Sequence, residues 1–161
     1  MSTFPIKNRY FGFVPAIIWA GAISLLSTDT FSADHTGKLL YGFFPLDDGN
    51  FSILHMLIRK AAHISEYAVL GWLTVRALFK YDGTLSRFTN LGRLVLFACL
   101  IGCLYASLDE VHQAFVPSRT ASIKDVLFDS LGFCLGAIAR SHWLRQTKQY
   151  PICQLKSQLF P

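Results

Sequence analysis

The sequence predicts an all-α membrane protein: a bundle of four transmembrane helices with both ends of the chain in the cytoplasm. Hydrophobic residues make up 52% of the 161 residues and charged residues only 16%, with a mean hydropathy of +0.38. Soluble domains contain about 25% charged residues, so this composition favours a membrane protein. Several apolar stretches also approach the roughly 20 residues that a helix needs to cross the hydrocarbon core.

The first expected span covers residues 10–28, which carry no charged side chain. A cleaved signal peptide usually has a shorter apolar region, followed by a small-residue cleavage site. We therefore interpret this stretch as a retained span. Residues 29–51 contain four aspartates together with glycine and proline, and they are expected to form a polar loop.

The second helix is expected over residues 52–79, with Ser52 as its cap. At 1.5 Å per residue it is roughly 40 Å long. Polar residues in its outer half are spaced by four, four and three positions and share one face, namely His55, Arg59, His63 and Glu66. The inner half is apolar all round, and a turn-rich linker follows at residues 81–90.

The third span is expected over residues 91–108 and continues into a polar helical end. Asp109, His112 and Gln113 share a face of that end because they are three and four positions apart. Pro117 is expected to stop this helix, since proline cannot continue the backbone hydrogen bonding.

The fourth span is expected over residues 123–139, with Ser122 as its cap and an acidic residue three positions later, as in a capping box. One stripe of this helix carries two acidic and two small residues: Asp125, Asp129, Gly132 and Gly136. The two glycines form a GxxxG pattern, which allows close approach of another helix. The acidic stripe is therefore expected to face the bundle interior, and the glycines also allow a homo-oligomer.

Lysine and arginine gather in three segments, namely the N-terminus, the linker between the second and third spans, and the tail. The positive-inside rule places all three in the cytoplasm. The chain then divides into a cytoplasmic N-terminus (1–9), a transmembrane domain (10–140) and a basic cytoplasmic tail (141–161). The net charge of +5 arises mainly beside apolar segments. Membrane topology and anionic lipid explain it better than nucleic acid does.

This topology brings two clusters of ionisable residues together at the extracytoplasmic end of the bundle. Such groups cost roughly 2.5–3.5 kcal/mol each at a helix centre, so they indicate function. The candidate catalytic residues, which suit acid–base chemistry, are His63, Glu66, Asp109 and His112. The candidate ligand-binding residues, whose arginines suit a phosphate or carboxylate, are Arg59, Glu110, Gln113, Arg119, Asp125 and Asp129.

Plainer interpretations stand beside these roles. Asp125 near a helix start is also explained as a cap that favours the helix dipole, worth roughly 0.3–1 kcal/mol. Arg119 is also explained as an ion-pair partner of Asp125 or Glu110. The histidines and carboxylates are suitable metal ligands, but no stretch has HExxH or another strong spacing, so no metal site is assigned. The four cysteines form no CxxC pattern.

Two blocks of the sequence resemble the signature motifs of the VanZ-like family of bacterial membrane proteins. They are RKAAHISEYAVLG, from Arg59 to Gly71, and SLDEVHQAFVPSRTASIKDVLFDSLG, from Ser107 to Gly132. SLLSTDTFS after the first span also resembles the family's serine-containing stretch. The matching positions include every candidate named above, together with Lys60, Tyr67, Gly71, Phe115, Pro117 and Gly132.

The resemblance covers most of residues 17–140 and implies a four-helix domain in the bacterial inner (plasma) membrane. The founding member is associated with low-level resistance to the glycopeptide teicoplanin. Neither catalysis nor a cofactor carries over, so turnover and cofactor are left open.

The main functional hypothesis is a site that binds, or modifies, an anionic lipid or a lipid-linked precursor of the cell envelope. The alternative is a non-catalytic interaction or accessory protein whose polar cluster is a buried structural network. A transporter is a weaker third interpretation, because the chain has no internal repeat.

Overall fold

The computed structural model describes four segments of the chain: residues 10–26, 48–81, 91–115 and 122–147. Four α-helices lie in them, namely α2 (Val14–Leu26), α4 (Asp48–Tyr81), α5 (Leu91–Gln113) and α6 (Ile123–Gln146). No strand occurs in these segments, which confirms the prediction of an all-α protein.

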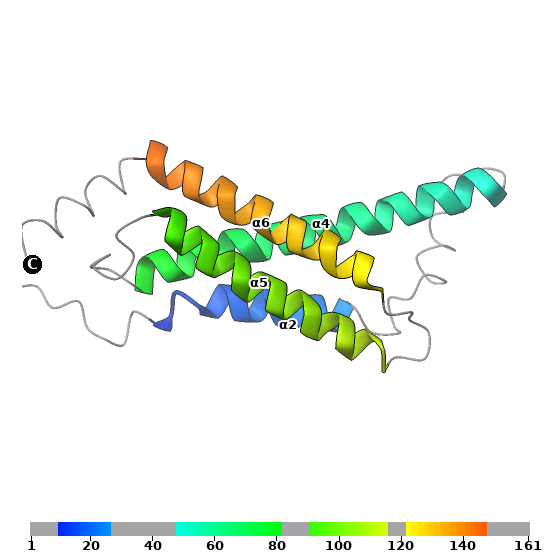
Figure 1. Cartoon of the computed structure of the whole chain (residues 1–161), viewed down its shortest axis with the longest axis horizontal. Coiled ribbons are helices and arrows are strands. Elements are labelled where there is room, and N and C mark those ends of the chain that lie inside the picture. Colours follow the sequence, from blue (N-terminus) through cyan, green and yellow to red (C-terminus); the bar gives the residue numbers. More distant parts are fainter. Residues whose placement is uncertain (1–9, 27–47, 82–90, 116–121, 148–161) are drawn as a thin grey trace, which may run out of the picture.

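The four helices run alternately in opposite directions, so their ends gather in two groups (Figure 1). One group contains the end of α2, the start of α4, the end of α5 and the start of α6; we call it the polar end. The other group contains the opposite ends of the same helices. Lysine and arginine predominate there, so we call it the basic end; its described basic residues are Arg76, Lys80, Arg93, Arg140 and Arg145.

Helix α4 is the longest element, with 34 residues. It begins at Asp48, four positions before the predicted cap at Ser52, and ends at Tyr81. Its second half is packed into the bundle, where Tyr67 and Val75 have no exposed surface. Its first turns extend past the neighbouring helices at the polar end (Figure 1).

Helix α5 agrees closely with the prediction. It begins at Leu91 and continues past residue 108, the end of the predicted span, to Gln113. Its buried face is formed at intervals of three and four positions by Leu91, Leu94, Ala98, Gly102, Ala106, Asp109, Glu110 and Gln113. The opposite face leaves large apolar side chains exposed: Leu96, Leu100, Leu104 and Leu108. A helix that exposes such a row suits contact with lipid chains better than contact with water.

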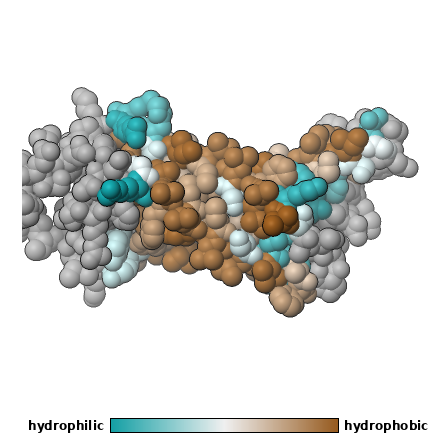
Figure 2. All heavy atoms as spheres, viewed as in Figure 1, coloured by the Kyte–Doolittle hydropathy of each residue, from teal (hydrophilic) through white to brown (hydrophobic). Residues whose placement is uncertain are grey.

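Among the described residues, α5 is the one helix long and apolar enough to cross a membrane, and α2 is apolar but has only 13 residues. On the face seen in Figure 2, hydrophobic surface covers the middle of the helices, while hydrophilic residues lie toward both ends. This distribution agrees with a membrane protein.

Helix α6 begins where the sequence predicts. Ser122 has extended backbone angles, and its side chain accepts a hydrogen bond from the Lys124 backbone N–H at 3.3 Å. The helix then continues to Gln146, beyond the predicted limit at residue 139. It continues because Arg140 and Leu144 are buried against the bundle. Helix α6 is therefore longer than the predicted fourth span of residues 123–139.

The GxxxG stripe of α6 packs against α4 of the same chain. A Cβ atom added at Gly132 or Gly136 would overlap the backbone of α4 at Ile64 or Ala68, respectively. Gly71 of α4 is equally close to the Phe133 backbone of α6. The close approach predicted from the glycines thus occurs within one chain, and the homo-oligomer stays a prediction.

Helix α2 is joined to the bundle by two aromatic side chains. Trp19 donates its Nε1–H to the Glu66 carbonyl on α4 at 2.9 Å. The Tyr105 hydroxyl of α5 donates to the Ala20 carbonyl at 2.7 Å and lies 3.0 Å from the Ser24 hydroxyl. These bonds fix α2 beside α4 and α5.

Candidate functional site

A pocket of about 380 Å³ lies at the polar end between α4, α5 and α6. Its titratable lining residues are His55, Arg59, Lys60, His63, Glu110, Asp125 and Asp129. Gln113 and Ser52 add uncharged polar groups, and Met56 and Phe128 add apolar surface. Both polar clusters of the sequence therefore contribute to one cavity.

The helical spacing of α4 brings its polar residues to one side, as predicted. His55, Arg59 and His63 all line the pocket. Each lies one turn from the next, because four residues make slightly more than one helical turn. Glu66 does not line the pocket, but its carboxylate lies beside His63 on the same face.

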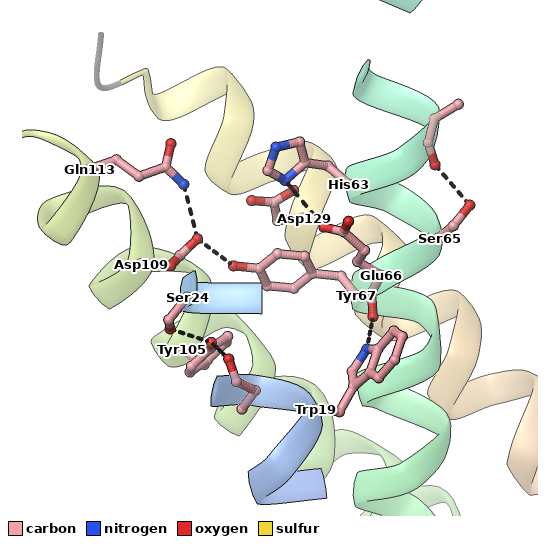
Figure 3. Close-up of polar contacts among 12 residues, drawn as sticks. Trp19, Ser24, His63, Ser65, Glu66, Tyr67, Tyr105, Asp109, Gln113 and Asp129 are labelled. Atoms are coloured by element: carbon pink, nitrogen blue, oxygen red, sulfur yellow. Dashed lines mark hydrogen bonds and ion pairs between the residues drawn. The ribbon is translucent and has the colours of Figure 1, made fainter. Parts of the chain in front are cut away.

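His63 lies between two carboxylates from different helices (Figure 3). Its Nδ1 is 3.8 Å from Asp129 Oδ1 of α6 and 4.0 Å from Glu66 Oε2 of α4. Asp129 is only 3% exposed. Both distances are within ion-pair range, although they are longer than a direct hydrogen bond. The arrangement joins α4 and α6 at a group that can take up and release a proton.

Asp109 is held by two hydrogen bonds inside the bundle. Its Oδ2 accepts from the Tyr67 hydroxyl at 3.2 Å and from Gln113 Nε2 at 2.9 Å. Tyr67 reaches across from α4 to α5 to make this contact (Figure 3). Asp109, predicted as a catalytic group, thus belongs to a buried polar network that includes Tyr67, which has no exposed surface.

Two further carboxylates connect the helices. Glu110 of α5 accepts a hydrogen bond from the backbone N–H of Ser122, so it anchors the start of α6. Asp125 pairs with Lys60 of α4 at 2.7 Å, and the Lys60 ammonium also lies 4.6 Å from the Phe128 ring centre. The Asp125 carboxylate therefore bonds α4 in addition to lying in the first turn of α6.

One predicted site residue within the described segments, His112, does not join this cluster. The His112 side chain is exposed and does not line the pocket. Arg119, predicted to hold a phosphate, lies outside the described residues, as does Pro117. In the part of the chain that the structure describes, no group of three or more histidine, cysteine or acidic residues is arranged to hold a metal ion.

Two residues gain roles that sequence reasoning did not assign. Tyr67 bonds Asp109, and Lys60 bonds Asp125. Tyr67 is four positions after His63 and Lys60 is three before it, so both lie near the His63 side of α4. The sequence predicts this shared side of α4. It does not predict which residues on other helices Tyr67 and Lys60 contact.

A helix bundle with a hydrophobic middle and an ionisable pocket at one end is typical of a helical membrane protein. The family model described as VanZ/LLP1 matches residues 10–144, well over half of the chain. The chain therefore belongs to the VanZ/LLP1 family, as the two sequence blocks predict. Neither a curated protein nor a solved structure gives a match.

Proposed function

We propose that this protein binds an anionic lipid, or a lipid-linked precursor of the cell envelope, in the polar-end pocket, and that His63 transfers a proton to or from that ligand. The observation that carries the proposal is the position of His63 between Glu66 and Asp129, in a pocket that Arg59 also lines. A proton-transfer group and a phosphate-binding group thus share one cavity.

The membrane placement that this proposal needs is a four-span topology in the bacterial inner membrane, with both chain termini in the cytoplasm. Its support is the alternating direction of the helices, the hydrophobic band and the basic residues at one end. The positive-inside rule then assigns the basic end to the cytoplasm and the polar end to the outer surface. The pocket would face the outer leaflet and the envelope.

The pocket offers groups that match the head and the chains of a lipid. The Arg59 guanidinium carries donors in a planar fork that suits phosphate oxygens. Lys60 shares its charge with Asp125, so it binds an additional anion less strongly than an isolated ammonium would. Met56 and Phe128 supply apolar surface for the adjoining part of the ligand.

The chemistry assigned to His63 is general acid–base catalysis. An imidazole changes charge near neutral pH, and a carboxylate at each side stabilises the protonated ring and orients it. Glu66 and Asp129 are positioning residues in this scheme. Asp109 is too firmly bonded to Tyr67 and Gln113 to be the first choice for proton transfer.

The test compares two histidine variants in cells. His63→Gln removes the proposed proton-transfer group, whereas His112→Gln removes an exposed histidine outside the pocket. Lipids and lipid-linked wall precursors would be quantified by mass spectrometry at equal protein levels. We expect at least one species to differ in amount from cells that lack the protein when the intact protein or His112→Gln is expressed. The same species should not differ when His63→Gln is expressed. Identical profiles for the intact protein and His63→Gln would reject proton transfer by His63.

A non-catalytic accessory protein is the second candidate, and a specific observation favours it. Tyr67, Asp109 and Gln113 satisfy one another, and Glu110 bonds the α6 backbone, so much of the polar cluster connects helices. Stability separates the two candidates. Removing a member of a structural network lowers the melting temperature, whereas removing a functional group is often neutral or stabilising. A large loss of stability in His63→Gln, without any change in lipids, would favour the accessory role.

A further inference from the structure

The basic end of the bundle contains a buried arginine that the polar-end site does not use. Arg140 lies in the last part of α6, one position beyond the predicted span, and is only 8% exposed. Its Nε is buried and has no hydrogen-bond partner. Within the described segments, no carboxylate forms an ion pair with it. A buried guanidinium in this state has lost hydration without gaining an oxygen acceptor.

Two tryptophans surround the Arg140 guanidinium. Its central carbon is 4.2 Å from the Trp143 ring centre and 5.2 Å from that of Trp72 on α4. The two rings are themselves 6.3 Å apart. Cation–π contacts stabilise the charge, but a ring supplies no oxygen to the N–H donors. Tryptophan is also enriched at the level of the lipid headgroups in membrane proteins.

The surrounding charge is positive. Arg76 of α4 is close enough for its positive charge to act on Arg140. The sequence has one acidic residue, Asp82, between Glu66 and Asp109, and none after Asp129. An anion bound beside Arg140 and Arg76 would relieve this repulsion and accept the unused hydrogen bonds.

We propose that Arg140, together with Arg76, Trp72 and Trp143, forms a second site at the basic end, which binds the phosphate of a lipid headgroup. Arginine binds phosphate through two parallel hydrogen bonds, whereas the tryptophans pack beside the glycerol region and the upper acyl chains. A soluble phosphate ester shares the recognised chemistry, and the experiment below separates it from lipid. The site is independent of the polar-end pocket and needs no reaction.

The tryptophans themselves report occupancy of this site. The chain has three tryptophans, so a Trp19→Phe background leaves Trp72 and Trp143 as the emitting residues. The full chain would be placed in vesicles of phosphatidylcholine that contain a small fraction of brominated phosphatidylglycerol or, in parallel, brominated phosphatidylcholine. Bromine quenches tryptophan on contact. Greater quenching by the anionic lipid therefore measures its enrichment beside these two rings.

We expect this excess quenching in the Trp19→Phe background and expect Arg140→Gln to abolish it, since a charge-assisted pair changes affinity by about tenfold or more. Arg145→Gln is the matched control, because it removes the same charge from an exposed position of the same helix. Arg140→Lys keeps the charge but loses the planar fork, so an intermediate excess is expected. If Arg140→Gln does not fold, Arg140→Lys takes its place in the comparison.

Inorganic phosphate, compared with sodium chloride at equal ionic strength, distinguishes the two sources of the anion. If phosphate alone removes the excess, the site takes soluble phosphate in preference to lipid; if both salts act equally, the lipid assignment holds. The proposal is overturned if Arg140→Gln, or Arg140→Lys in its place, retains the same excess quenching as Arg145→Gln.

Discussion

Asp109 illustrates how a single buried carboxylate is held in this protein. It is 4% exposed, and donors from Tyr67 and Gln113 reach the same oxygen. Tyr67 comes from a different helix, so its hydroxyl joins α4 to α5 as well as donating to one oxygen of the carboxylate. An unsatisfied carboxylate at this position would be costly, because little water reaches it.

Removal of the Tyr67 hydroxyl should therefore weaken the bundle. We expect Tyr67→Phe to lower the free energy of unfolding by about 1 kcal/mol, which is typical for one hydrogen bond in a helical membrane protein. Thermal unfolding in detergent measures this change. Tyr10→Phe is the matched control, because Tyr10 is 61% exposed. Equal melting temperatures for the two variants would contradict the importance of the Tyr67–Asp109 bond.

Sequence periodicity predicts some of these residue positions and misses others for geometric reasons. His55, Arg59 and His63 lie close to one line along α4, so their common face follows from spacing alone. On α5 the shared face of Asp109 and Gln113 is also confirmed, since the two side chains are hydrogen-bonded. His112, however, is exposed, whereas Asp109 and Gln113 beside it on α5 are buried. Three-residue spacing was too coarse a criterion there.

At the level of helices, the contact between α4 and α6 depends on glycine. The α4 backbone at Ile64 and Ala68 occupies the space that a side chain at Gly132 or Gly136 would need. This close contact brings Asp129 of α6 near His63 of α4. The site is therefore sensitive to the separation of these two helices.

Two alanine substitutions test this dependence. Gly136→Ala should push α6 away from α4 and destabilise the protein by about 2 kcal/mol, within the range for overpacking. Gly21→Ala in α2 is the control, because nothing lies within 4 Å of its added Cβ. It should be neutral or stabilising by up to about 1 kcal/mol, as expected from helix propensity. Equal stability of the two variants, measured by chemical unfolding, would contradict the close packing.

The start of α6 was easier to predict from sequence than its end. Ser122 is a recognisable cap, and the structure shows it accepting a backbone hydrogen bond. The continuation of α6 to Gln146 has no comparable signal, because Arg140 reads as a polar terminus. The burial of Leu144 and the packing of the Arg140 side chain against Trp72 and Trp143 make that turn part of the bundle.

For the whole molecule, the alternation of basic and apolar segments predicts which helix ends lie together. The structure agrees, since the starts of α4 and α6 lie with the ends of α2 and α5 (Figure 1). The family also follows from the sequence, through its two blocks. The angular order of the helices and the partners of each polar group depend on tertiary packing, which periodicity does not encode.

The proposed topology predicts opposite accessibility for the two ends. In a background without the four native cysteines, Ser52→Cys should react with an impermeant thiol reagent added outside intact cells. Gln146→Cys should react only after the membrane is opened. Both positions are exposed in the structure, so burial does not limit either reaction. Labelling of Ser52→Cys only from the cytoplasmic side would reverse the orientation and remove the pocket from the envelope.

Native mass spectrometry of the purified protein would show whether the polar-end pocket binds a lipid anion through Arg59. The Arg140→Gln background removes the proposed basic-end site. Any phosphatidylglycerol that this protein retains therefore reports binding in the polar-end pocket alone. We expect this lipid to stay bound to the Arg140→Gln protein. It should also stay bound when Lys80→Gln is added as a control. Adding Arg59→Gln instead should lower its affinity about tenfold or more. Equal retention of the lipid by the Arg59→Gln and Lys80→Gln proteins would rule out binding through Arg59.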